Sequence, residues 1–124
     1  MPQSNEASLL LLTVTEASFE SEVLRATLPV VVEVSSEWCP PCKFAEASLC
    51  ALAGTTQDTL KIVTIDADRS PDLVSKLRVY GVPMFMVFFK GKELDRDAGY
   101  AGPVQLQRWV AEICESVGVG EPVA

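Results

Sequence analysis

Two cysteines, Cys39 and Cys42, are the residues of this chain best suited to chemistry. They lie where a β-branched run ends and a helical pattern begins, and two prolines separate them. Two cysteines three positions apart at a helix start can close a small disulfide with little movement of the chain. The sulfur of Cys39 would lie at the positive end of the helix dipole, beside unpaired backbone N–H groups. That position lowers its pKa and favours the thiolate near neutral pH.

Helical geometry predicts different roles for the two sulfurs. Cys42 shares one stripe of the expected helix with apolar residues, so we expect its side chain to point inward. These apolar residues are Ala45, Leu49 and Leu52. Cys39 falls at the tip of the helix, where we expect it to be accessible. The Cys39 thiolate would attack a substrate disulfide, and the shielded Cys42 thiol would resolve the mixed disulfide.

An alternative interpretation of the same pair is half of a zinc or iron–sulfur site. Such a site needs four ligands. The chain has no second C-x-x-C pair and no histidine, and its other cysteines, Cys50 and Cys114, stand alone. The context of the pair therefore favours a dithiol over a metal site.

Strand and helix patterns alternate along the chain and place the cysteine pair between a central strand and a helix. Strands are expected at 9–14, 30–34, 61–65, 84–89 and 93–98. Helices are expected from Thr15 or Ser18 to about 26, from 39 to 53 with Gly54 as the stop, and at 71–77 and 103–117. The order β-α-β-α-β-α-β-β-α predicts an α/β fold, with a mixed central sheet flanked by helices on both faces.

The composition limits what else the chain could do. Its 124 residues include ten Lys and Arg against seventeen Asp and Glu, a formal charge of −7, and 48% are hydrophobic. That length predicts one domain, and the hydrophobic content excludes intrinsic disorder as the main state. The acidity argues against nucleic acid and anionic membranes as partners. The absence of histidine excludes Ser–His and Cys–His catalysis.

The two ends of the chain differ in composition from this alternating region. We expect residues 1–8 to be a flexible segment, 9–117 to be one domain and 118–124 to be a flexible tail. No segment approaches the ~20 apolar residues that a membrane-spanning helix needs. The apolar run at 9–12 has no Lys or Arg before it, so we predict no signal peptide and a cytoplasmic location.

The segment 38–43 reads Trp-Cys-Pro-Pro-Cys-Lys and resembles the active-site motif of the thioredoxin family, which normally has Gly at the position of Pro40. The resemblance covers about residues 9–117 and includes further residues at thioredoxin-like spacings. These are Ser18-Phe19, Val32-Glu33, Ile65-Asp66, Gly81-Val82-Pro83 and Gly91. It implies the thioredoxin fold and a disulfide reductase with Cys39 as the nucleophile and Cys42 as the resolving thiol.

The resemblance also implies a substrate-binding surface. Pro83 would be a cis-proline that faces the disulfide, and extended substrate backbone would pair with the main chain of Val82. The other residues of this mostly apolar surface would be Trp38, Pro40 and Gly99. Taken alone, Pro83 is also compatible with a proline at the start of a strand, which tolerates the loss of its N–H.

Glu33 interrupts a valine-rich strand and matches the position of a buried carboxyl group beneath the inner cysteine of the family. A carboxyl group buried there would have a raised pKa and could take the proton from Cys42, directly or through water. The alternative is a carboxylate near a strand end that reaches solvent. Three departures from the family pattern bear on redox tuning and partner range. Ile62 replaces a lysine, Ser35 a tryptophan and Ala47 a helix-kinking proline.

The other two cysteines are expected in opposite environments. Cys50 falls on a helix face with Lys43 and Glu46 and is expected to be exposed, whereas Cys114 falls in an apolar stripe and is expected to be buried. This contrast argues against a second disulfide and favours two single thiols. The alternative is that Cys50 is a site of intermolecular oxidation or modification.

Together these patterns predict a thiol–disulfide oxidoreductase that reduces protein disulfides through a Cys39/Cys42 cycle. The redox centre is the chain's own dithiol, so no bound cofactor is expected. The resemblance implies disulfide-containing protein substrates and a thioredoxin reductase as partner. We expect a monomer with no nucleic-acid or membrane partner. The alternatives are a thioredoxin-fold binding module without turnover and a dedicated redox partner of a single substrate.

Overall fold

A five-stranded mixed sheet lies at the centre of the computed structural model, which describes residues 11–56 and 58–118. The strands are β1 (Leu12–Thr13), β2 (Val30–Ser35), β3 (Lys61–Asp66), β4 (Met84–Phe89) and β5 (Lys92–Ala98). They are ordered β1-β3-β2-β4-β5, so β2 is the central strand. β2 pairs parallel to β3 and antiparallel to β4, while β1 pairs parallel to β3 and β5 antiparallel to β4. The predicted mixed sheet is therefore confirmed.

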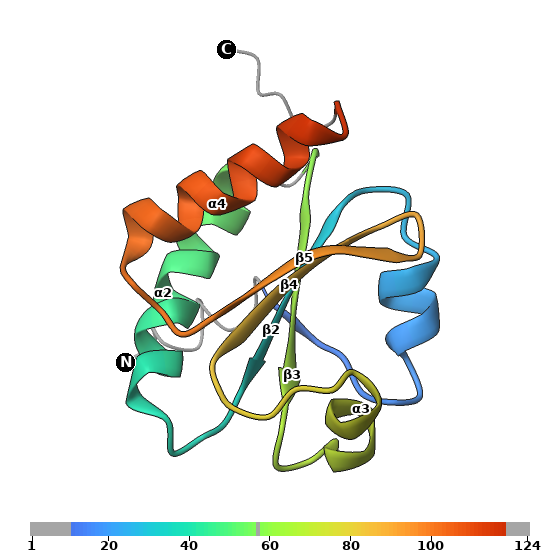
Figure 1. Ribbon diagram of the computed structural model, residues 1–124, viewed down its shortest axis with the longest axis vertical. Helices are drawn as coiled ribbons and strands as arrows, with labels where there is room; N and C mark the ends of the chain where they lie inside the picture. Colours follow the sequence, from blue (N-terminus) through green and yellow to red (C-terminus); the bar gives the residue numbers. More distant parts are fainter. Residues whose placement is uncertain (1–10, 57, 119–124) are drawn as a thin grey trace.

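Helices cover both faces of this sheet (Figure 1). α2 (Pro40–Thr55) and α4 (Pro103–Ser116) lie on one face, and α3 (Pro71–Lys76) and the short π-helical turn η1 (Glu20–Leu24) lie on the other. Each face has its own apolar cluster, with Leu49 and Phe85 beneath α2 and α4 and with Phe19 and Phe88 on the opposite side. The rings of Phe19 and Phe88 meet edge to face, 5.6 Å apart. The sheet is thus enclosed by two apolar layers, as the α/β prediction requires.

The alternation of side chains along β2 decides where its single carboxyl group lies. Successive residues of a strand point to opposite faces of the sheet. Val30, Val32 and Val34 belong to the cluster beneath η1 and α3, so Val31 and Glu33 point towards α2 and α4. Because β2 is the central strand, Glu33 is as completely buried as the valines, with 0% of it exposed.

The helix expected from Thr15 or Ser18 to residue 26 is much shorter in the structure. Only Glu20–Leu24 is helical, and no side chain caps its start. Thr15 and Ser18 bond to each other in the preceding turn, where the Thr15 N–H donates to Ser18 Oγ at 3.0 Å. Such local side-chain bonds compete with helix formation, so the expectation that Thr15 or Ser18 caps the helix is wrong, although a helical turn does lie within the expected range.

The expected stop of the next helix at Gly54 is also wrong, because α2 continues to Thr55. The hydroxyl groups of Thr55 and Thr56 both donate to the carbonyl oxygen of Leu52, at 3.0 and 2.8 Å. These side chains donate hydrogen bonds to a carbonyl group at the helix end. In many helices, backbone N–H groups that follow a glycine supply such hydrogen bonds instead. The threonines therefore mark the end of α2.

The other boundaries agree with the sequence prediction to within two residues, except at β1. The first strand was expected at 9–14, of which residues 9 and 10 lie outside the described part, and β1 itself covers Leu12–Thr13. The segments expected to be flexible, 1–8 and 118–124, also lie outside the described residues apart from Gly118. Within the described ranges, no helix has the length and apolar character to cross a membrane.

Candidate active site

The two cysteines of the C-x-x-C pair lie at the junction of β2 and α2. Cys39 is the N-cap residue of α2 in an extended conformation, and Cys42 follows in the first helical turn. Their Cα atoms are 5.3 Å apart and their sulfurs form a disulfide. The central strand thus leads into a turn that places a small disulfide at the start of a helix.

The two prolines between the cysteines decide which backbone donors reach the Cys39 sulfur. Pro40 and Pro41 occupy the first positions of α2 and have no N–H group. The N–H of Cys42 is the next donor along the chain, and it lies 3.3 Å from Cys39 Sγ and 3.1 Å from the Cys39 carbonyl oxygen. In the reduced protein, a Cys39 thiolate would be stabilised by this one backbone donor and by the positive end of the helix.

The exposure of the two sulfurs follows the expected order, but Cys39 is less accessible than expected. Cys39 is 5% exposed and Cys42 is 0% exposed. Cys39 is joined to Cys42 and held by its N–H, which turns the sulfur towards the protein. Cys39 nevertheless lines a surface groove, which Cys42 does not. The disulfide therefore borders the surface groove on the Cys39 side.

The groove beside Cys39 has a volume of about 520 Å³ and is flanked by two exposed aromatic side chains. Trp38 is 73% exposed and Tyr80 is 87% exposed. Pro40 and Val82 line the groove as well. Sequence analysis did not single out Tyr80, although its position directly before the Gly81-Val82-Pro83 motif was a usable signal. The two aromatic rings give the groove the apolar character that suits an extended peptide.

Pro83 and Gly99 lie next to each other, but neither lines the groove beside Cys39: Pro83 follows the groove residue Val82, and Gly99 lines a separate hollow beside Phe85 and Tyr100. The Val82–Pro83 peptide bond is cis, as the family resemblance implied. The N–H of Gly99 donates to the Pro83 carbonyl oxygen at 2.9 Å, and Gly99 has a φ of +82°, a conformation that favours glycine. Pairing of β5 with β4 thus brings together two residues that are 16 positions apart in the chain.

Arg96 is a residue that sequence analysis missed. Its guanidinium donates to the carbonyl oxygens of Leu77 at 2.9 Å and Arg78 at 3.1 Å, and it pairs with Glu93. Carbonyl groups at the end of a helix lack intrahelical hydrogen-bond partners. Arg96, on β5, supplies donors to two carbonyl groups just after α3. It therefore fixes the end of α3 and, with it, the start of the loop that carries Tyr80.

Glu33 lies within the sheet on the face covered by α2, the helix that carries Cys42. Its Oε1 accepts a long hydrogen bond of 3.4 Å from the Thr64 hydroxyl, and its Oε2 is buried with no hydrogen-bond partner among the described residues. Burial, and after it the negative charge of Glu46, raise the pKa of Glu33 from 4.5 to about 8. The Thr64 hydrogen bond and the positive charge of Lys43 oppose this rise. Such a carboxyl group exchanges its proton near neutral pH.

All three departures from the family pattern lie on the face of the sheet that α2 covers, which is also the face of Glu33. Ile62 is buried and pairs in register with Val31, two residues along β3 from Thr64, which pairs with Glu33. The position that often holds a lysine is therefore apolar here. Ser35, at the end of β2, lines a hollow beside α2 together with Ala47.

The expectation that Cys50 is exposed is wrong. Cys50 is 8% exposed and belongs to the apolar cluster beneath α2 and α4, to which Cys114, 5% exposed, also belongs. The helix turns Cys50 towards the sheet more than its spacing from Lys43 suggested. Burial raises the pKa of both thiols, and the charges of Glu46 and Glu33 raise that of Cys50 further. A thiol with a raised pKa is mostly protonated near neutral pH and is a poor nucleophile. The burial and raised pKa of Cys50 therefore argue against intermolecular oxidation at this residue.

Comparison with known proteins points to one family. A family model described as Thioredoxin matches residues 10–112. Thioredoxin X, chloroplastic, from Arabidopsis thaliana is 37% identical over 106 residues, which are 84% of this chain and 58% of that protein. The Thioredoxin of Rickettsia typhi is 33% identical over 78% of this chain and 92% of its own length. Thioredoxin 1 of Synechococcus elongatus is 31% identical over 69% of this chain and 80% of its own length.

Proposed function

This chain belongs to the thioredoxin family of thiol–disulfide oxidoreductases, and from that premise we propose that it reduces disulfides in other proteins. Cys39 is the nucleophile and Cys42 the resolving thiol. The observation that carries the proposal is the Cys39–Cys42 disulfide at the start of α2, with Cys39 lining a groove and Cys42 fully buried. An accessible attacking sulfur and a shielded resolving sulfur are what a dithiol cycle needs.

The cycle transfers two electrons from the dithiol to the substrate. The Cys39 thiolate attacks one substrate sulfur, forms a mixed disulfide and releases the other substrate sulfur as a thiolate. Cys42 loses its proton and attacks Cys39, which releases the second substrate thiolate. The products are a reduced substrate with two thiol groups and an oxidised Cys39–Cys42 pair.

Glu33 is the proposed acceptor of the Cys42 proton. It is fully buried on the sheet face beneath α2, and its Oε2 has no hydrogen-bond partner among the described residues. A pKa of about 8 lets this carboxyl group both accept and release a proton near neutral pH. The transfer is direct or passes through one water molecule.

The groove supplies the proposed contacts to substrate. Trp38, Pro40 and Val82 line it, and the cis Pro83 follows Val82 in the chain and is hydrogen-bonded to Gly99. An extended substrate segment would hydrogen-bond to the main chain of Val82 and pack on the aromatic rings. Extended recognition of this kind takes affinity from the backbone, so it suits many different substrates.

The partner that returns electrons belongs to the same proposal. Thioredoxins as a family act on disulfide substrates and are reduced by reductases, and we propose an NADPH-dependent thioredoxin reductase for this chain. We also propose that the chain works as a monomer in the cytoplasm without binding nucleic acid. Size-exclusion chromatography with light scattering tests the monomer, and a fluorescent fusion in the source cell tests the location.

A trapping experiment tests the function. Cys42→Ser should attack substrate disulfides but fail to release them, so covalent adducts with insulin or cell proteins should accumulate. Cys39→Ser should form no adducts, and both variants should fail to reduce insulin with dithiothreitol as the electron source. A folded wild-type protein with two titratable thiols that leaves insulin disulfides intact would instead favour a binding module.

A further inference from the structure

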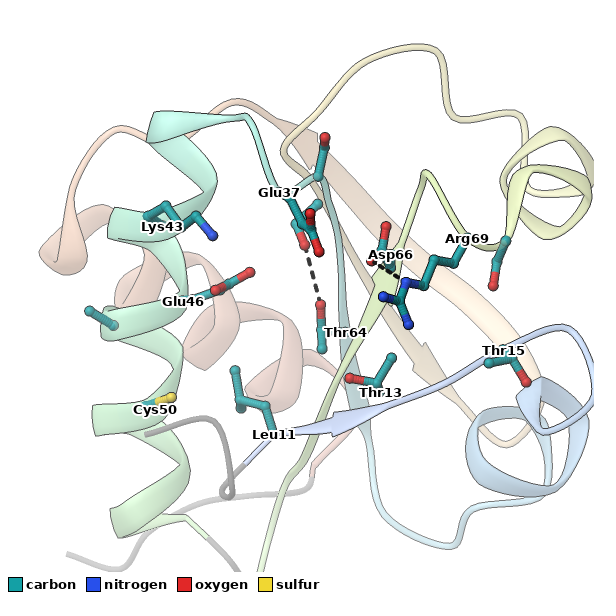
Figure 2. Close-up of a pocket in the computed structure, with 14 residues that line it drawn as sticks. Leu11, Thr13, Thr15, Glu37, Lys43, Glu46, Cys50, Thr64, Asp66 and Arg69 are labelled. Carbon is teal, nitrogen blue, oxygen red and sulfur yellow. Dashed lines mark hydrogen bonds and ion pairs between the residues drawn. The ribbon is translucent and has the colours of Figure 1, made fainter. Parts of the chain in front are cut away.

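A second concave surface lies between α2 and the strands β1 and β3 (Figure 2). This hollow has a volume of about 710 Å³ and shares only Ser36 with the substrate groove. Figure 2 shows Lys43 and Glu46 extending from α2 into the hollow towards Thr64 on β3. Ser35 is small where the family commonly has tryptophan, which leaves this space open.

The hollow reaches the buried carboxyl group of Glu33 through hydroxyl groups. Glu33 pairs in register with Thr64, whose Oγ1 lies 3.4 Å from Glu33 Oε1. The same Thr64 Oγ1 lies 3.5 Å from Ser35 Oγ. Thr64 and Ser35 both line the hollow, whereas Glu33 has no exposed surface. The Thr64 hydroxyl is therefore the link between the buried carboxyl group and the hollow.

The proposed cycle requires such a link, because each turnover leaves a proton on a carboxyl group that has no surface exposed to bulk solvent. We propose that this proton leaves Glu33 through the Thr64 hydroxyl and enters solvent in the hollow between α2 and β3. A hydroxyl group can accept one proton and donate another, so it can relay a proton without a net change. Thr64 acts through Glu33 and is thus a positioning residue. Its role in turnover rests on the proposed function.

The proton balance of the relay is simple. Cys42 gives its proton to the Glu33 carboxylate and becomes a thiolate. The Glu33 carboxyl group then passes a proton to Thr64 Oγ1, while the Thr64 hydroxyl proton moves to water in the hollow. The reverse path reprotonates Glu33 when the disulfide is reduced again. No oxidant or reductant takes part in these steps.

The charged groups around Glu33 fit a route through this hollow. Glu46 and Lys43 approach from α2 with opposite charges, and the Cys50 thiol lies on the same helix. The residue opposite Glu33 on β4 is Phe85, which offers neither a proton nor a charge. The hollow side is thus the polar approach to Glu33, and the β4 side is apolar.

The test uses the oxidised protein, which needs no substrate. A rapid pH jump from 6 to 9 is followed at the infrared C=O stretch of the protonated carboxyl group, which Glu33→Gln assigns. Thr64→Val should slow the loss of this band at least about tenfold and raise its pH midpoint, because a hydrogen bond that stabilises the carboxylate is removed. Thr64→Ser keeps the hydroxyl and should retain the wild-type rate. Thr13→Val removes another hydroxyl from the hollow and should change neither quantity.

The same variants are then compared in single-turnover resolution of a mixed disulfide. In Thr64→Val, the pH profile of the resolution rate should shift upward by the same amount as the midpoint of the infrared band. The circular dichroism spectrum should be unchanged. A Thr64→Val protein that loses the Glu33 proton at the wild-type rate would overturn the relay. A slowed proton release in a protein that does not reduce insulin would support the relay and reject the proposed reductase function, so the two failures are distinguishable.

Discussion

Burial of the Glu33 carboxyl group makes the stability of the fold depend on pH. The folded state raises the pKa of Glu33 from 4.5 to about 8, so the folded state holds this proton more tightly than the unfolded state. The contribution of Glu33 to the free energy of unfolding is therefore fully present below about pH 4.5 and is lost as the pH rises towards 8. Each unit by which the pKa is raised corresponds to about 1.4 kcal/mol.

Glu33→Gln should remove this pH dependence, because the amide has the same shape and does not ionise. The free energy of unfolding of the oxidised variant should exceed that of the wild type by an amount that grows between pH 4.5 and 8. Urea unfolding across pH 4–9 measures it, with Glu37→Gln as a matched change at an exposed position.

The same substitution should slow the resolution step by ~10²–10⁴-fold if Glu33 accepts the Cys42 proton. Stopped-flow reduction of a disulfide substrate under single-turnover conditions measures this rate. A variant that is less stable than the wild type at pH 8 and resolves at full speed would make Glu33 a structural carboxylate with an unidentified partner.

At the scale of single elements, the start of α2 controls the energy of the reduced state. Pro40 takes the place of the usual glycine and has no N–H, which leaves the Cys42 N–H as the donor to Cys39 Sγ. Pro40 also stiffens the turn, so it acts on both redox states.

Pro40→Gly should therefore change the reduction potential by tens of millivolts, where about 30 mV corresponds to 1.4 kcal/mol for this couple. The sign depends on whether the added donor or the loss of stiffness has the larger effect. Equilibration with glutathione at several ratios, with Pro41→Gly as a comparison, gives the value. A potential that stays within a few millivolts of the wild type would show that Pro40 does not tune the pair.

Local patterns predicted the elements well where burial and periodicity agreed. The β-branched run of β2 and the almost wholly apolar run of β4 gave strands close to those observed. The first helix was overestimated because Thr15 and Ser18 bond within a turn rather than cap a helix. Cys50 was placed on the wrong face because α2 is covered by both the sheet and α4, which a single helical stripe does not reveal.

At the scale of the whole molecule, the site depends on contacts between distant parts of the chain. The sequence indicated Cys39, Cys42 and Glu33 from their types and spacing. It offered for Tyr80 only a position next to the Gly81-Val82-Pro83 motif, and it could not indicate Arg96 across the end of α3 or Thr64 opposite Glu33. Those positions follow from strand register and loop packing, which appear only when the sheet is assembled.

The reduction potential of the Cys39–Cys42 pair tests the central claim most directly, because it decides the direction in which electrons flow. The purified protein is equilibrated with mixtures of reduced and oxidised glutathione, and the dithiol fraction is read after acid quenching and alkylation. A reductase of protein disulfides should give a value close to about −270 mV. A value close to about −120 mV would mean that the pair oxidises its partners, and it would contradict the proposed function.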